Sequence, residues 1–237
     1  MFLVLQYDNR PINNLDMGVI NRNVDYCNQH KYHHRFITQK FEIPPYWIKV
    51  MLMHQYIHSG EYEGVLWIDT DACIHDKTIR IEDIVLGKKS FYMSPDKPVW
   101  NMQNTKFLFN AGVFLVLHTS AGKDIMNEWM NSYNEKKWYK NDVNQWLTSG
   151  EWAGETYEQG CFITHIMPKY INDIHAYDWK FFQSNYSDVK PKEEGFDMSD
   201  PNDFITINSE ASTIFILHFC SDKNKRYNYL LTMQQPM

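Results

Sequence analysis

The sequence predicts an α/β protein built around an open, largely parallel sheet. Short apolar runs alternate with helical patterns through the first half of the chain, as in successive strand–helix units. At 237 residues the chain is long enough to bury one sizeable core. Because neither an internal repeat nor a low-complexity linker divides it, we expect a single domain over residues 1–237.

The first elements follow from the apolar runs and from the residues that end them. Two prolines open the second helix, since proline is tolerated in a first helical turn. The predicted elements are strands at residues 2–7, 35–38 and 65–68, a helix at 15–30, and a helix from Pro44-Pro45 to near Gly60.

The later elements are read from the same signals. Ile125, Trp129 and Tyr133 recur at helical spacing and share one face. Residues 177–201 are rich in Asp, Ser, Lys, Pro and Gly, which indicates an irregular surface segment. The remaining predictions are strands at 91–94, 111–117 and 214–219, and helices at 123–133, 141–148, 158–165 and 223–233.

Composition and charge narrow the functional classes. The formal net charge of -6 at pH 7 argues against sequence-independent binding to nucleic acid, which needs a basic stripe. The 4 cysteines lie far apart and form no paired motif, so neither a zinc site nor a disulfide framework is indicated.

Targeting signals are not apparent in the sequence. It has no run of 18 apolar residues, and the apolar stretch after Met1 is too short for a signal peptide. We therefore expect a soluble cytoplasmic protein without a membrane anchor.

The most informative motif is Asp69-Thr70-Asp71, which ends the apolar run of residues 65–68. Two carboxylates one residue apart at the end of a buried strand are aimed at one point. Ligands of open α/β sheets bind beyond the carboxyl ends of the strands. The pair suits a divalent cation with open positions for phosphate oxygens, whereas the alternative is a solvated turn.

Six segments follow one another in order over roughly residues 15–225: Asn21-Arg22-Asn23-Val24-Asp25-Tyr26-Cys27, Trp47-Ile48-Lys49, Leu66-Trp67-Ile68-Asp69-Thr70-Asp71-Ala72, Asn110-Ala111-Gly112-Val113-Phe114-Leu115, Glu158-Gln159 and His218-Phe219. Their order and content resemble those of family 34 glycosyltransferases. The resemblance implies the GT-A fold, a single Rossmann-like domain with a mostly parallel central sheet flanked by helices.

In this family pattern Asp69, Asp71 and His218 hold Mn²⁺ or Mg²⁺, which bridges the phosphates of a nucleotide sugar. Imidazole with carboxylates is better matched to manganese than to calcium. Without the resemblance, a histidine after an apolar strand would be taken for a hydrogen-bonded core residue.

Other roles are also implied. Lys223, five residues after His218, would place an ammonium against the departing diphosphate; the alternative is a solvated basic run. Lys49 would reach the donor phosphate or sugar, or be a surface charge. Tyr7 and Asp8, at the end of the first strand, would meet the base or ribose.

The sugar-facing candidates are Asn110 and Gln159. The small residues after Asn110 would let a sugar approach the backbone while its amide bonds hydroxyls, although Gly112 could instead be required by a turn. Gln159 would lie near the anomeric carbon, with Glu158 beside it.

Two pairs of tryptophans differ in the polarity of their sequence surroundings. Trp67 and Trp129 lie within apolar patterns and are predicted to be core residues. Trp152 and Trp179 lie in polar loop surroundings and are the better candidates for stacking on acceptor sugar.

The resemblance implies a metal-dependent, retaining glycosyltransferase. The donor would be a nucleoside diphosphate sugar, with a uridine base and galactose, xylose or glucose favoured, and the acceptor a hydroxyl of a glycan or glycoprotein. Many relatives carry a membrane anchor before the first strand, so the start of this chain favours a bacterial or virus-encoded enzyme.

Two alternatives stay open. One is a nucleotide-sugar binding module without turnover. The other is a phosphohydrolase with an aspartate nucleophile, which is disfavoured because its motif would follow the first strand and no Asp-Asp pair occurs.

Overall fold

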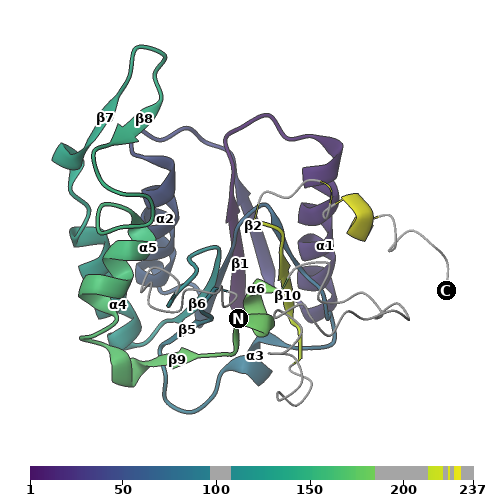
Figure 1. Cartoon of the computed structure of the whole chain (residues 1–237). Helices are drawn as coiled ribbons and strands as arrows, with labels where there is room; N and C mark the ends of the chain where they lie inside the picture. Colours follow the sequence, from purple (N-terminus) through teal and green to yellow (C-terminus); the bar gives the residue numbers. More distant parts are fainter. Residues whose placement is uncertain (97–107, 185–212, 221–223, 225–226, 231–237) are drawn as a thin grey trace, which may run out of the picture.

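The computed structural model describes residues 1–96, 108–184, 213–220, 224 and 227–230 (Figure 1). Its centre is a six-stranded sheet with strand order β2-β1-β3-β6-β5-β9. The strands are β1 Phe2–Tyr7, β2 His33–Ile37, β3 Gly64–Ile68, β5 Phe91–Met93, β6 Val113–Leu117 and β9 Ile174–Ala176.

Strand β6 runs against its neighbours β3 and β5, whereas the other pairings in this sheet are parallel. The predicted mostly parallel α/β sheet is thus confirmed. The reversal places the start of β6 beside the end of β3, with Val113 opposite Ile68. The loop before β6 therefore lies next to the motif that follows β3.

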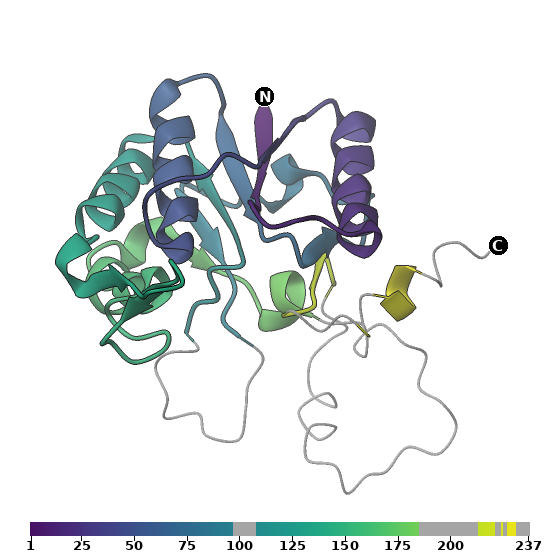
Figure 2. The same ribbon diagram turned by 90° about the horizontal axis from the view of Figure 1, so that it is seen from above.

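Helices cover both faces of this sheet. Helix α1 (Asn14–His30) lies on one face, and α2 (Pro45–Ser59) and α4 (Ser120–Asn131) lie on the other, as Figure 2 shows from above. Successive residues of β1 alternate between the two cores: Leu3 packs with α2 and Val4 with α1 residues. This period of two is what a strand buried on both faces requires.

The ends of the major helices have clear local causes. Pro45 occupies the first turn of α2, and Gly60 caps its other end with φ 72°, in the left-handed region that favours glycine. Helix α4 begins three residues earlier than predicted, because the Thr119 side chain accepts a hydrogen bond from the Gly122 N–H (3.0 Å).

Two small sheets complete the described strands. Strand β10 (Ile216–His218) pairs antiparallel with β4 (Ala72–Ile74), which places His218 opposite Ala72. Strands β7 (Trp138–Lys140) and β8 (Trp146–Thr148) form a hairpin. The shorter elements are α3 Ile81–Ile84, α5 Glu158–Cys161, α6 Trp179–Gln183, η2 Glu135–Lys137, η3 Phe162–Ile166 and η4 Ile171–Asp173.

The helix predicted over 141–148 is wrong. The Asn141 side-chain oxygen accepts from the backbone N–H groups of Val143 (3.2 Å) and Gln145 (2.8 Å), and Asn144 has φ 61°. These contacts close the turn of the β7–β8 hairpin instead, since asparagine competes for backbone partners and tolerates the left-handed region.

Four short elements were not predicted from the sequence, namely β4, α3, β9 and α6. Other differences concern the ends of elements. Strand β2 starts two residues before the predicted segment, and the last strand is confined to Ile216–His218. Residues 177–201 include α6, and their part beyond 184 lies outside the described residues. Of the predicted closing helix, residues 224 and 227–230 are described, and they are helical.

Among the described residues, no helix is both long enough and apolar enough to span a membrane.

Candidate functional site

The candidate site lies where β3 ends. The backbone turns tightly at Asp69-Thr70-Asp71, with the Ala72 N–H donating to the Asp69 carbonyl (3.0 Å). The loop before β6 closes on the same turn, because the Asp69 N–H donates to the Gly112 carbonyl (2.8 Å). The two carboxylates are therefore held at the carboxyl end of a buried strand.

Asp69, Asp71 and His218 converge at this point. Each offers one potential ligand atom, and these atoms all lie within 4.8 Å of one another. His218 comes from the far end of the sequence, and its strand β10 reaches the site by pairing with β4, which directly follows Asp71.

The orientation of His218 is fixed by Gln183 in α6. The imidazole is 6% exposed, and its Nδ1 lies 2.6 Å from the Gln183 Oε1, which can only accept. Nδ1 is therefore the donor, and Nε2 faces the Asp71 Oδ1 at 3.3 Å. Burial works against the charged imidazolium, but the Asp71 carboxylate outweighs it and raises the His218 pKa well above its usual value.

Gly112 makes room for that imidazole. A Cβ atom on Gly112 would lie 2.2 Å from the His218 Cε1 and 2.9 Å from the Asn110 Oδ1. Among the described glycines the positive-φ positions are Gly60 and Gly87, so a left-handed turn does not explain Gly112. The close approach of His218 does.

Lys49 is buried beneath the Asp69 carboxylate rather than exposed. It is 8% exposed, and its Nζ donates to Asp69 Oδ1 (2.9 Å), Asp69 Oδ2 (3.0 Å) and the Ala111 carbonyl (2.9 Å). Burial would lower the Lys49 pKa, but the charges of Asp69 and Glu158 outweigh burial and raise it. The alternative of a surface charge is thus wrong.

Trp67 also holds Asp69 in place. Its indole Nε1–H donates to the Asp69 Oδ1 at 2.6 Å, while the ring itself is 2% exposed. The Lys49 ammonium lies 5.6 Å from the centre of the same ring. Asp69 therefore has a fixed position before any ligand arrives.

Helix α5 supplies the other side of the site. Glu158 is 5% exposed with Oε1 3.9 Å from the Lys49 Nζ, and burial raises its pKa to about 7. Gln159 accepts a hydrogen bond from the Ala111 N–H through its Oε1 (3.1 Å). The structure thus places Gln159 of α5 against the loop that carries Asn110.

Asn110 is 9% exposed and bridges two segments. Its Oδ1 accepts from the Gly112 N–H (2.8 Å), and its Nδ2 donates to the Asp96 Oδ1 (2.6 Å). Burial raises the pKa of Asp96. Sequence reasoning missed both Asp96 and Gln183, because each acts through a tertiary contact with a residue far away in the chain.

Asp8 joins the end of β1 to the Asp69-Thr70-Asp71 turn. Its carboxylate accepts from the Thr70 hydroxyl (2.9 Å) and from the Arg10 guanidinium (2.6 Å). Burial opposes ionisation, but these hydrogen bonds outweigh it and lower the Asp8 pKa. Tyr7 packs beside Phe41, with ring centroids 5.8 Å apart.

The other predicted site residues fall elsewhere. Lys223 lies outside the described residues. Trp67 and Trp129 are core residues as predicted. Trp179 is not in a loop, because it lies in α6 and is 8% exposed, whereas Trp152 is 64% exposed.

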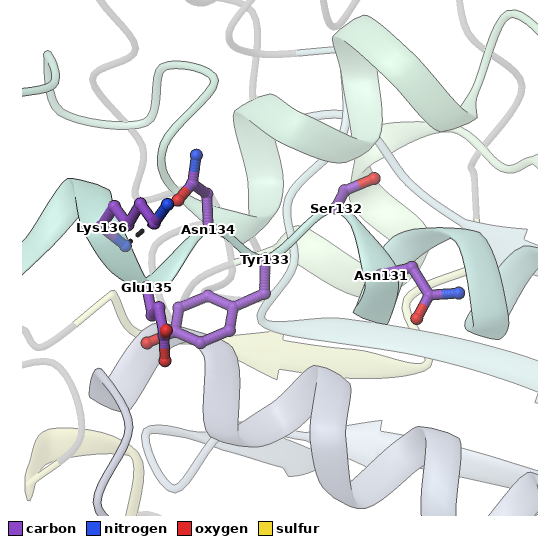
Figure 3. Close-up of a pocket in the computed structure, with 6 residues that line it drawn as sticks. All are labelled: Asn131, Ser132, Tyr133, Asn134, Glu135 and Lys136. Carbon is purple, nitrogen blue, oxygen red and sulfur yellow. Dashed lines mark hydrogen bonds between the residues drawn. The ribbon is translucent and has the colours of Figure 1, made fainter.

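A hollow of 520 Å³ lies apart in sequence from these residues, after α4 (Figure 3). It is lined by residues 131–136, and the Lys136 N–H donates to the Asn134 Oδ1 there (3.1 Å). It shares no residue with the carboxylate and histidine cluster.

Comparisons with known proteins give a family and a fold. Residues 2–107 match the model of the galactosyl transferase GMA12/MNN10 family, which is glycosyltransferase family 34. That span includes the Asp69-Thr70-Asp71 motif and Lys49. No curated protein matches the chain.

Solved structures are similar over nearly the whole chain. A glycosyltransferase involved in glycosylation of the major capsid of the virus PBCV-1 has TM-score 0.66 and 13% identity, covering 97% of this chain and 98% of its own. The bifunctional WbbM has TM-score 0.52 and 10% identity (96% and 49% covered). The galactosyltransferase LgtC, with donor and acceptor sugar analogues, has TM-score 0.49 and 14% identity (100% and 98% covered).

The family match confirms the resemblance that the motifs predict, and the structural likeness confirms the fold. Residues 2–107 match the model of glycosyltransferase family 34, and the chain has the GT-A fold.

Proposed function

We propose that this glycosyltransferase is metal dependent and moves a sugar from a nucleoside diphosphate donor to a hydroxyl of a glycan or glycoprotein. The observation that carries the proposal is the convergence of Asp69, Asp71 and His218 at the carboxyl end of β3. Open α/β sheets bind their ligands at this edge.

The three side chains fit a divalent cation by their chemistry. Two carboxylates and an imidazole suit Mn²⁺ or Mg²⁺. The hydrogen bond from His218 Nδ1 to Gln183 leaves Nε2 as the ligand atom, an outer-shell arrangement common to metal-binding histidines. Bound there, the cation would neutralise charge on the departing diphosphate.

The residues around the cation would organise the reaction. Lys49 and Trp67 fix the Asp69 carboxylate, so that little reorganisation accompanies donor binding. We assign Gln159 to the support of positive charge developing on the sugar, and Asn110 to its hydroxyls. Lys223 would stabilise the departing diphosphate.

The donor and its base are proposed from the family. A UDP-sugar carrying galactose, xylose or glucose is favoured, with Tyr7 and Asp8 near the base or ribose. Asp8 is suited to this position because it is hydrogen-bonded to Thr70 within the metal-facing turn. We place the reaction in the cytoplasm.

The test is a screen of UDP- and GDP-sugars for hydrolysis with and without Mn²⁺. We expect one donor class to be hydrolysed only with metal. The Asp71→Asn variant should lose metal-promoted binding of UDP in calorimetry, because the cation loses an anionic ligand. Asp142→Asn, on the exposed hairpin turn, is the matched control and should bind as the wild type does.

Two results would contradict the proposal. Donor binding without hydrolysis or transfer would favour a binding module. Unchanged metal-promoted UDP binding in Asp71→Asn would remove that residue from the site.

A further inference from the structure

Four aromatic rings form a cluster beside the candidate site, which we call the aromatic platform: Tyr46, Trp138, Trp152 and Tyr157. Tyr157 is at its centre, with ring centroids 4.9 Å from Tyr46, 5.1 Å from Trp138 and 5.1 Å from Trp152. Their planes meet at 72°, 74° and 69°, which is the favourable edge-to-face geometry.

Trp152 is exposed although it is packed. It contacts Tyr46 as well, with centroids 5.5 Å apart at 72°, yet 64% of its surface remains exposed. The edge-to-face contacts with Tyr46 and Tyr157 orient the Trp152 indole and leave much of its surface exposed to solvent. An indole that its neighbours hold in one orientation can present an aromatic face to a ligand.

The loop that carries Trp152 is fixed by its backbone. The Gly154 N–H donates to the Glu151 carbonyl and the Tyr157 N–H to the Gly154 carbonyl, both at 2.9 Å. Ala153 has φ 54°, a left-handed conformation that costs free energy in a residue with a Cβ atom. The local structure thus stabilises one strained loop conformation.

A tight contact anchors the same loop to the site. A Cβ atom on Gly160, one residue after Gln159, would lie 2.3 Å from the carbonyl oxygens of Ala153 and Gly154. The Trp47 indole N–H also donates to the Thr156 carbonyl (3.0 Å). The loop is therefore packed against the helices that carry the site residues.

The platform borders the site along two elements. Tyr46 stands one helical turn before Lys49 on α2, and Tyr157 directly precedes Glu158. Because Glu158 and Lys49 are 3.9 Å apart, both elements meet beneath Asp69. Figure 1 shows the β7–β8 hairpin at the end of the molecule where the loops after β1 and β2 lie.

We propose that the aromatic platform binds the acceptor, a pyranose ring whose C–H face stacks on the exposed indole of Trp152. A sugar ring has one apolar face and a polar edge, so it needs an aromatic surface with polar groups around it. Glu151 and Glu155 are exposed on the same loop and can accept from hydroxyls. This inference rests on the proposed function, whose acceptor site it defines.

The test uses p-nitrophenyl glycosides of glucose, galactose, mannose and xylose as acceptors. Trp152→Ala should raise the acceptor KM about tenfold, as loss of one stacking contact would. Hydrolysis of the UDP-sugar without acceptor should stay within about twofold of wild type, since the metal site is untouched. Trp152→Phe should retain part of the affinity because it keeps an aromatic face.

Tyr139→Ala is the matched control. Tyr139 is 54% exposed on β7 of the neighbouring hairpin and lies outside the platform. Its loss should leave the acceptor KM unchanged. Equal effects of Trp152→Ala and Tyr139→Ala, or an unchanged KM in Trp152→Ala, would overturn the proposal.

Direct binding separates this inference from the proposed function. If the wild type hydrolyses no nucleotide sugar, the function fails, and saturation-transfer NMR with the same glycosides tests the platform alone. Signal in the wild type that is lost in Trp152→Ala supports the platform. Absence of signal, or a change in oligomeric state by sedimentation as the sole effect of Trp152→Ala, would overturn it.

Discussion

At the scale of single residues, the site depends on a buried chain of charges. Lys49 lies between Asp69 and Glu158 and donates to both oxygens of Asp69. These three side chains stabilise one another at this edge, because burying any one of their charges alone would cost free energy. The sequence identified the three residues but not their mutual contacts.

Lys49→Met should therefore destabilise the fold by about 2 kcal/mol or more, since it leaves a buried carboxylate without its partner. Urea unfolding measures the loss. The control is Lys169→Met, whose ion pair with Glu128 is largely exposed and should cost less than about 1 kcal/mol. Similar losses for the two variants would show that the buried ion pair of Lys49 stabilises the fold no more than an exposed pair does.

Glu158 makes stability depend on pH. Burial raises its pKa from 4.5 to about 7, so the folded protein holds a proton that the unfolded chain has released between those values. The contribution of Glu158 to the free energy of unfolding is fully present below about pH 4.5 and is lost as the pH rises to about 7.

Glu158→Gln should remove that slope. Relative to wild type, the variant should gain about 1–3 kcal/mol of unfolding free energy between pH 4.5 and 7.5, measured by urea titration. Glu128→Gln should differ from wild type in the opposite sense and below about pH 4.5, because the Lys169 hydrogen bond lowers the Glu128 pKa from 4.5. A constant difference between Glu158→Gln and wild type across this range would contradict the assignment.

At the scale of elements, pairing between distant strands builds the site. The apolar runs of β1 and β3 and the prolines of α2 could be read from sequence, because their signals are local. The hairpin over 138–148 could not, since the turn contacts of Asn141 outweigh a helical pattern.

The same limit applies to the site. Asp69 and Asp71 follow from the end of a strand, a local feature. The position of His218 depends on the β10–β4 pairing, and Gln183 and Asp96 depend on contacts across the fold. Residue types alone carry no signal for such contacts.

The reversal of β6 gives a test at this scale. Gly112→Ala should abolish metal-promoted UDP binding in calorimetry, because a Cβ atom would displace His218. Adding His218→Ala should restore the stability lost in the single variant, since it removes the clashing ring. Gly18→Ala is the control: its Cβ would meet the end of the flexible Leu230 side chain, and UDP binding should be unchanged.

At the scale of the whole molecule, helix α2 carries Tyr46 of the aromatic platform and Lys49, and Tyr157 of the platform directly precedes Glu158. In the retaining reaction that the family resemblance implies, the acceptor hydroxyl would attack on the face from which the diphosphate departs. The diphosphate could then accept the hydroxyl proton itself, without a separate carboxylate base.

We therefore expect the transfer to retain the anomeric configuration. Proton NMR of early product from an α-linked UDP-sugar should show an α-linkage. Gln159→Ala should slow transfer while leaving UDP binding intact. Gln145→Ala, on the exposed hairpin, should change neither transfer nor UDP binding. A β-linked product would contradict the retaining assignment.

The position of β10 in the sequence also determines when the site can form during synthesis. The carboxylates of the cluster are synthesised early, but the imidazole that completes it belongs to residue 218 of 237. During translation the central sheet can form long before this strand emerges from the ribosome. The candidate cation site is therefore completed only after every strand of the central sheet has been synthesised.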